Sequence, residues 1–291
     1  MTALGVVAKV LPAPARSLAI RWREQWRLNR LPAATCEAAA LAALDTERLA
    51  GLLGDPALDA EWPAVARELE RFEITSTAGG VNPGDRRALY YLVRGLGPRR
   101  VLEVGTHIGA STVHIAAALR ANGGRPEERP SLITVDILDV NDPVTRPWER
   151  YGSHFSPAAM IEKLGMADAV RFIARPSLEF LSETTEPFDL IFLDGDHGAA
   201  TVYRELPAAL RRLRPGGIVL LHDYFPRGRA LWPGESVIAG PWLGVERLRR
   251  EGAALSVLPL GKLRWPTKLG STVTSLAVVA RQEPAVPQTS S

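Results

Sequence analysis

The residue types best suited to chemistry stand where two apolar runs end, in the second half of the chain. One run leads into Asp194, with His197 three residues later, and another leads into His222 and Asp223. If both runs are parallel strands, their carboxyl ends meet at one edge of a sheet and bring Asp194 close to Asp223. Two neighbouring carboxylates repel each other unless they are protonated or bridged by a cation. The pattern therefore predicts an oxygen-rich site, which suits Mg²⁺.

The two histidines leave more than one role open. His222 could be a softer metal ligand, which would favour Mn²⁺, Fe²⁺ or Zn²⁺, or it could support the ligands through a hydrogen bond. The site could equally function without a metal. His197 has the chemistry of a general base, because an imidazole can take a proton from a hydroxyl group near neutral pH. It could instead cap a helix or face the adenine side of a cofactor.

An apolar, strand-like segment at 101–105 ends in a glycine turn that precedes a predicted helix. Gly105 and Gly109 allow backbone conformations that other residues avoid, and they let a ligand approach closely. A dinucleotide-binding fingerprint would need glycine where His107 stands, and a P-loop would need lysine where Ala110 follows Gly109. Both phosphate-binding interpretations therefore fail. A different ligand, or a purely structural turn, remains.

Asp136 ends the second predicted strand. In nucleotide-binding α/β folds, an acid at this position accepts hydrogen bonds from ribose hydroxyls. The same residue could instead cap a helix or face solvent in a loop. Ser177 follows the third predicted strand, where a serine is also suited to a plain helix N-cap.

These motifs together resemble class I S-adenosylmethionine-dependent methyltransferases. The turn from Glu103 to Gly109 is similar to the family's first motif, E-x-G-x-x-x-G. The segments D-G-D-H at 194–197 and L-R-P-G-G-(x)4-H-D-Y at 213–224 are similar to metal-dependent small-molecule O-methyltransferases. That group is related to catechol O-methyltransferase and to bacterial tailoring enzymes. The resemblance covers about residues 84–280, with the motifs in the family's order.

The resemblance implies a cofactor, a metal and a reaction. The residues implied to bind S-adenosylmethionine are Glu103, Gly105, Thr106, Gly109, Asp136, Ser177 (at the adenine-contacting turn) and Asp194. A divalent metal, Mg²⁺ first with Mn²⁺ or Fe²⁺ as alternatives, would be held by Asp194 and Asp223. His222 stands where relatives carry an acid or asparagine, and His197 falls at the general-base position. The implied reaction is methyl transfer to a hydroxyl group of a small molecule.

Strand-like and helical segments alternate from about residue 100 onward. Nearly continuous apolar strands predict a parallel sheet covered on both faces. The segments 254–258 and 273–280 have no helix between them, which predicts a hairpin. With the resemblance, we expect an α/β fold with a Rossmann-like, mostly parallel seven-stranded sheet, helices on both faces, an antiparallel C-terminal edge strand and a helical N-terminal extension. The expected divisions are 1–83 for the extension, 84–281 for the methyltransferase domain and 282–291 for a disordered tail.

Residues 36–53 of the N-terminal extension have a helical, Ala/Leu-rich composition. Asp85, at the start of the expected domain, is suited to cap the helix that follows it. The first thirty residues are basic, with Glu24 as their only acid and with Trp22 and Trp26 one helical turn apart. An interfacial amphipathic helix or a targeting peptide would have this pattern. We favour a helical arm that packs on the core or on a second subunit, so a homodimer through the N-terminal helices is a hypothesis.

The composition excludes several classes of protein. Cys36 is the only cysteine, so an intrachain disulfide and a Cys-based zinc site are excluded, and a reducing cytoplasm is the expected location. No apolar run has the length of a membrane span. The formal net charge of +3 is too small and dispersed to indicate nucleic acid binding. The expected partner is a small-molecule acceptor that carries a hydroxyl group.

Two other functions stay open. The first is an enzyme of the same fold that methylates nitrogen, or one with metal-dependent chemistry other than methyl transfer, which a cluster of two histidines and two aspartates would suit. The product mass would separate these possibilities. The second is a non-catalytic cofactor-binding or assembly protein, which would have no need of Asp194, His197 and Asp223 together.

Overall fold

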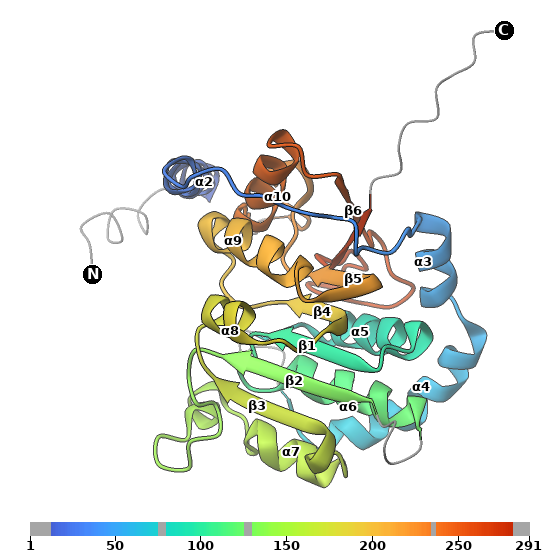
Figure 1. The fold of residues 1–291 in the computed structure, drawn as a ribbon. Coiled ribbons are helices and arrows are strands. Elements are labelled where there is room, and N and C mark those ends of the chain that lie inside the picture. The colour runs from blue at the N-terminus through green and yellow to red at the C-terminus, as the bar shows by residue number, and fades with distance from the viewer. Residues whose placement is uncertain (1–12, 75–79, 125–129, 234–236, 282–291) are drawn as a thin grey trace, which may run out of the picture.

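The computed structural model describes residues 13–74, 80–124, 130–233 and 237–281. A seven-stranded sheet runs through the molecule, with helices on both of its faces (Figure 1). The predicted α/β fold is confirmed. The predicted disordered tail at 282–291 lies outside the described residues.

Helices and strands alternate in the order predicted for the second half of the chain. The helices are α2 (Ala13–Asn29), α3 (Thr46–Leu53), α4 (Pro56–Glu70), α5 (Pro83–Leu96), α6 (Ala110–Asn122), α7 (Pro157–Lys163), α8 (Ser177–Glu183), α9 (Ala199–Leu210) and α10 (Gly240–Arg250). The strands are β1 (Arg100–Val104), β2 (Ser131–Asp136), β3 (Val170–Ala174), β4 (Phe188–Leu193), β5 (Leu213–Leu221), β6 (Leu255–Pro259) and β7 (Ala277–Arg281). Short 3₁₀ turns are η2 (Pro147–Tyr151), η3 (Ala167–Ala169) and η4 (Pro226–Gly228).

The strand order is β3-β2-β1-β4-β5-β7-β6. Strands β1 to β5 are parallel, and β7 pairs antiparallel with both β5 and β6. The hairpin predicted from the missing helix is therefore present, with β7 inserted between β5 and β6. The order reverses at β1, which has β2 on one side and β4 on the other. Ligands of open α/β sheets bind in the crevice at such a switch point.

Successive residues of the central strands enter two separate cores. In β4, Leu190 and Phe192 pack on the side of α5 and α6, whereas Ile191 and Leu193 pack on the side of α8, α9 and α10. Because both faces are buried, the strands lack a polar face and read as continuous apolar runs. This explains why they were predictable from the sequence.

Two local predictions for the first ninety residues are wrong. Residues 36–45 are not helical, and Leu41 instead forms a β-bridge with Gly217 of β5. Only Thr46–Leu53 forms a helix, α3. The α5 cap is Asn82, whose side chain accepts a hydrogen bond from the Asp85 amide. Asp85 itself lies inside the helix and is fully buried.

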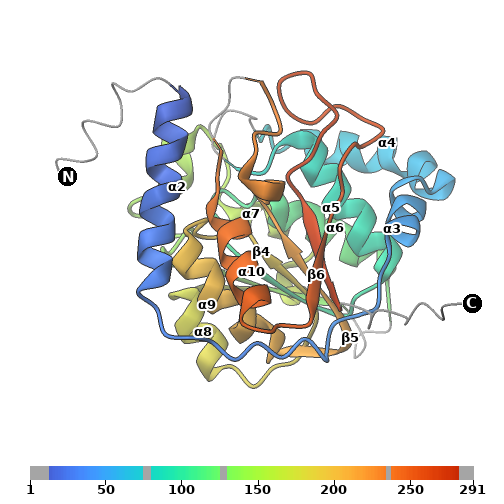
Figure 2. The same cartoon turned by 90° about the horizontal axis from the view of Figure 1, so that it is seen from above.

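The described part of the basic arm forms α2, which packs against α9 and α10 (Figure 2). Leu28 is fully buried in this contact. Glu24 is also buried, and its carboxylate accepts a hydrogen bond of 2.8 Å from the Ala199 amide at the start of α9. Trp22 and Trp26 face outward, with 74% and 50% of their surfaces exposed. The arm thus packs on the domain, and the homodimer remains a hypothesis.

The described helices include none that combines the length and the apolar character needed to cross a membrane.

Glu24→Ala should destabilise the protein. The substitution removes the acceptor of the Ala199 amide and a carboxylate that faces the N-terminal end of α9, which carries partial positive charge. We expect the free energy of unfolding to fall by about 1–3 kcal/mol, as for other lost hydrogen bonds to buried charged groups. Denaturant unfolding would measure it. Glu37→Ala, at an exposed glutamate, is the matched control, and equal stability of the two variants would contradict the structural role of Glu24.

Candidate functional site

A cavity of about 600 Å³ opens at the carboxyl ends of the parallel strands, at the switch point between β1 and β4. This volume lies within the range of small-molecule sites. Seven of the residues predicted from the sequence line it: Gly105, Asp136, Ser177, Asp194, His197, His222 and Asp223. The sequence therefore placed most of its candidates in one cavity.

The glycine turn after β1 lies directly against the loop after β4. Gly105 has a φ of 96°, and a Cβ atom there would lie 2.3 Å from the Asp194 carbonyl oxygen. Only glycine fits this approach. The Asp194 amide donates to the Val104 carbonyl at 2.9 Å, which extends the β1–β4 pairing by one residue. The turn and the loop thus form one wall of the cavity.

Three of the predicted cofactor-binding residues lie behind this wall. The Glu103 carboxylate is fully buried and accepts hydrogen bonds from the Thr112 and Thr134 hydroxyls at 2.6 and 2.7 Å. The Thr106 hydroxyl shares a hydrogen bond of 2.6 Å with Thr134. Gly109 packs against α7, away from the lining residues. Their part in cofactor binding remains a prediction, and their positions indicate support of the turn.

Burial changes the acid–base properties of two carboxyl groups beside the cavity. It raises the pKa of Glu103 to about 7, although hydroxyl donors partly oppose the effect. It also raises the pKa of Glu205 to about 7, although the hydrogen bond that Glu205 accepts from Ser177 opposes the effect.

Asp136 supports the glycine turn, since one of its carboxylate oxygens accepts a hydrogen bond from the His107 amide at 2.9 Å. It therefore fixes the turn while it lines the cavity.

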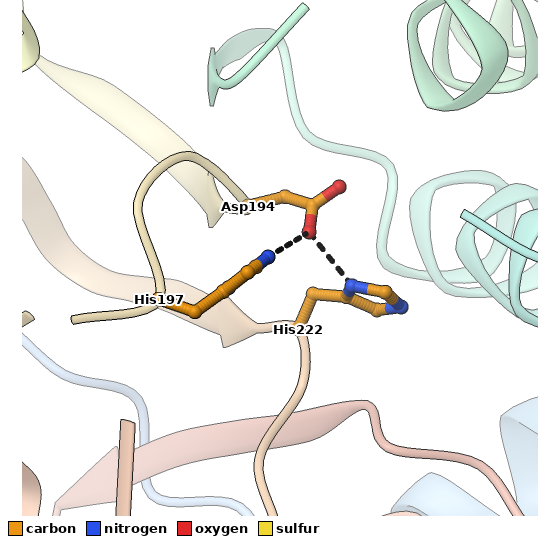
Figure 3. A group of neighbouring side chains, drawn as sticks. All are labelled: Asp194, His197 and His222. Atoms are coloured by element: carbon orange, nitrogen blue, oxygen red, sulfur yellow. Dashed lines mark ion pairs between the residues drawn. The ribbon is translucent and has the colours of Figure 1, made fainter. Parts of the chain in front are cut away.

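The acids and histidines after β4 and β5 converge at one end of the cavity. His197 Nε2 and His222 Nδ1 lie 3.8 and 2.7 Å from the same oxygen of Asp194 (Figure 3). Asp223 completes the group, with one carboxylate oxygen 3.4 Å from His197 Nε2. The predicted proximity of the two strand ends is present in the structure. The Asp223 backbone has a φ of 50°, and its carboxylate accepts a hydrogen bond from Ser275 at 3.2 Å.

His222 is buried between carboxylates. Burial disfavours the imidazolium ion, but Asp194 and Asp223 outweigh this effect and raise the pKa of His222 well above its usual range. Burial would likewise raise the pKa of Asp223, yet the neighbouring His222 and His197 lower it below the usual value. On its far side, His222 Nε2 lies 3.3 Å from an Asp85 carboxylate oxygen.

The donor set fits a divalent cation. One ligand atom each from Asp194, His197 and His222 lies within 4.8 Å of the others. His222 Nδ1 is buried and has no properly aligned hydrogen-bond partner, although an Asp194 oxygen lies only 2.7 Å away. Imidazole nitrogens and carboxylate oxygens are common ligands of divalent cations, so these residues would suit such an ion. The predicted ligand Asp223 lies beside this group rather than within it.

Sequence analysis missed three residues of this region. Asp85 and Glu205 lie on helices remote in sequence from the residues they contact, and no local motif marks them. His107 lines the cavity and packs against Tyr151 with ring centroids 4.2 Å apart. Its place inside the glycine turn was a usable signal, because His107 stands between Gly105 and Gly109, where a ligand was expected to approach.

Comparison with known proteins identifies similar enzymes. Residues 102–224 match a family model described as a methyltransferase domain. The chain is 28% identical over 179 residues to a catechol O-methyltransferase of Mycobacterium tuberculosis, covering 61% of this chain and 69% of the relative. It is 29% identical over 164 residues to a catechol O-methyltransferase of Niastella koreensis, covering 55% of this chain and 64% of the relative.

A solved structure shares the fold. The O-methyltransferase TomG from Streptomyces achromogenes, in complex with SAM, matches with a TM-score of 0.50 and 20% identity. The match covers 82% of this chain and 100% of that chain. It supports the Rossmann-like architecture predicted from the strand and helix pattern.

Gly105→Ala should damage the cavity wall. The added methyl group would overlap the Asp194 carbonyl oxygen, so the glycine turn and the loop after β4 would have to move apart. We expect a lower melting temperature and at least about tenfold weaker binding of S-adenosylmethionine, because overpacking of this kind costs about 1–3 kcal/mol. Calorimetric titration and thermal unfolding would measure both. Gly51→Ala is the control, since nothing lies within 4 Å of a Cβ there. Unchanged affinity in Gly105→Ala would contradict the close approach.

Glu103→Gln should change how stability depends on pH. The folded-state pKa of about 7 exceeds the ordinary value of 4.5, so between these values the folded state binds the proton more tightly than the unfolded state does. The contribution of Glu103 to stability is therefore lost as the pH rises from about 4.5 to 7. By about pH 8 the buried charge costs about 3 kcal/mol, which the neutral glutamine avoids.

Denaturant unfolding of both proteins from pH 4.5 to 8 would measure the difference in unfolding free energy, in which other titrating groups cancel. The gain of Glu103→Gln over the wild type should grow with pH. A difference that is constant over this range would contradict the raised pKa.

Proposed function

We propose that this chain is a class I S-adenosylmethionine-dependent O-methyltransferase, which methylates a hydroxyl group of a small molecule with His197 as general base and with help from a divalent metal. The match to a methyltransferase domain and the similarity to O-methyltransferases support the proposal. The observation that carries the proposal is the convergence of Asp194, His197 and His222 at one end of a cavity whose wall is the glycine turn.

S-adenosylmethionine fits the part of the cavity between the glycine turn and the ends of β2 and β3. Gly105 would let the backbone approach the ligand, and the Asp136 carboxylate, which lines the cavity, would accept hydrogen bonds from ribose hydroxyls. Ser177 and Glu205 lie farther along the same cavity and would supply polar contacts for the adenine ring of the cofactor. When bound, the cofactor supplies the methyl group, and the chain contributes alignment, which accounts for much of the rate in such displacements.

Asp194, His197, His222 and Asp223, here called the acid–histidine group, would bind and activate the acceptor hydroxyl. Asp194, His222 and the neighbouring Asp223 would hold a divalent cation, which when bound would make an acceptor hydroxyl more acidic. His197 is about one-third exposed and faces the cavity, so it can reach a hydroxyl proton. Its backbone is fixed by α10, because a Cβ at Gly240 would lie only 1.8 Å from the His197 carbonyl oxygen. The base therefore has a defined position.

The relatives suggest which acceptor to test first. Two of them carry the name catechol O-methyltransferase, and a catechol presents two adjacent hydroxyl groups. One hydroxyl would lie against His197 while the other meets Asp223, whose carboxylate oxygen is 3.4 Å from His197 Nε2. We therefore propose a vicinal diol on an aromatic ring as the acceptor class.

The site composition also favours one second candidate. A cluster of two histidines and two aspartates can hold metals other than Mg²⁺, so metal-dependent chemistry without methyl transfer is a distinct possibility. The mass of the product distinguishes the two functions, because methylation adds a CH₂ unit and oxygenation adds an oxygen atom.

His197→Ala should lower kcat for methylation of a catechol by about 10²–10⁴-fold, the usual contribution of a general base. Binding of S-adenosylmethionine, measured by calorimetry, should change little. Chelation of divalent cations should abolish turnover, and added Mg²⁺ should restore it. His154→Ala is the matched control, since His154 is an exposed surface histidine near Glu73. Full activity of His197→Ala, or no methyl gain by mass spectrometry in the wild type with any diol, would contradict the proposal.

A further inference from the structure

Asp85 is a fully buried carboxylate at the start of α5, far in sequence from the acid–histidine group. The Asn82 side chain donates to one Asp85 oxygen at 2.7 Å and accepts from the Asp85 amide at 3.1 Å. The same Asp85 oxygen lies 3.3 Å from His222 Nε2. The other oxygen has no hydrogen-bond partner among the described residues. Asp85 is thus oriented toward His222 and toward no other histidine.

A buried carboxylate is costly unless hydrogen bonds or opposite charge offset its desolvation. The N-terminal end of α5 offsets part of this cost through its partial positive charge. The turn that contains Asp85 is also held from outside, because the Trp265 indole donates to the Gly84 carbonyl at 2.9 Å and a Cβ at Gly84 would overlap the Pro266 carbonyl. The position of Asp85 is therefore constrained on both sides, and its orientation is a property of the fold.

The two nitrogens of His222 face two different carboxylates. Nε2 faces Asp85, and Nδ1 lies 2.7 Å from Asp194 without the alignment of a hydrogen bond. Metal-binding histidines use this arrangement in general: one nitrogen donates to a carboxylate, which leaves the lone pair of the other nitrogen free for the metal.

We propose that Asp85 is a positioning residue, which holds the proton of His222 on Nε2 and thereby directs the Nδ1 lone pair toward a divalent cation beside Asp194. This role rests on the metal-assisted function proposed above. It explains why the position after β5 carries histidine: the fold supplies the supporting carboxylate from α5. Asp85 is not among the residues that line the cavity, so it would act through His222.

The test is Mn²⁺ binding to the full-length protein, followed by electron paramagnetic resonance of the free ion. Asp85→Ala should weaken Mn²⁺ binding by about 10–100-fold, the usual effect of losing a carboxylate behind a metal-bound histidine. Asp85→Asn should bind more tightly than Asp85→Ala, because the amide oxygen can still accept the Nε2 proton. The affinity for S-adenosylmethionine in calorimetry should stay within about twofold in both variants, since Asp85 does not line the cavity. Asp168→Ala, at an exposed aspartate, is the control.

A double-mutant cycle separates positioning from a general effect on the fold. In a His222→Ala background, Asp85→Ala should cause no further loss of Mn²⁺ affinity, because the residue through which it acts is gone. Additive losses would overturn the positioning role, and so would wild-type Mn²⁺ affinity in Asp85→Ala. A wild-type protein that binds no Mn²⁺ would overturn the metal-assisted function and the role of Asp85 with it. The two failures are therefore distinguishable.

Discussion

The parallel pairing of β1 with β4 is the interaction on which the candidate site depends. Val104 and Leu193 are partners in the register, and the Asp194 amide extends the pairing by one more hydrogen bond. Both strands end at this level, so the glycine turn and the acid–histidine loop leave the sheet side by side. The contact between Gly105 and the Asp194 carbonyl then fixes their separation. A backbone contact, rather than any side chain, thus determines how far the proposed cofactor lies from the proposed base.

Around this contact the protein keeps several ionisable groups out of water. Burial raises the pKa values of Glu103 and Glu205. Burial alone would lower the pKa of His222, but the surrounding carboxylates raise it instead. Such perturbed groups concentrate at functional sites, because the environment that shifts them also strengthens electrostatic interactions with a ligand. A bound cation would take over the neutralisation of the carboxylates that His222 provides. Charge balance would therefore connect the proposed metal, His222 and Asp85.

The sequence predicted the strands and the cavity better than it predicted the supporting contacts. Apolar runs such as 188–193 are recognisable because both faces of the sheet are buried, and each run ends directly at a polar residue. Side-chain direction is harder to predict: the Thr106 hydroxyl shares a hydrogen bond with Thr134, and its expected part in cofactor binding stays a prediction. The pairing of His222 with Asp85 joins residues 137 positions apart, and no spacing rule reaches that far. Residues 36–45 have helical composition, but hydrogen bonds between this segment and Gly216 and Gly217 draw it out along the sheet.

The position of α2 has a consequence for how the protein is made. This helix is the first described element to leave the ribosome, yet its partners α9 and α10 are among the last, and Glu24 meets Ala199 across 175 positions. Its buried face, including Leu28, therefore stays without its native partners while most of the domain is synthesised. Contacts of such high sequence separation form late, and they close the chain around elements that are already folded. The native contacts of α2 can therefore form only after α9 and α10 have been synthesised, and Glu24 then accepts from the Ala199 amide, two residues after His197.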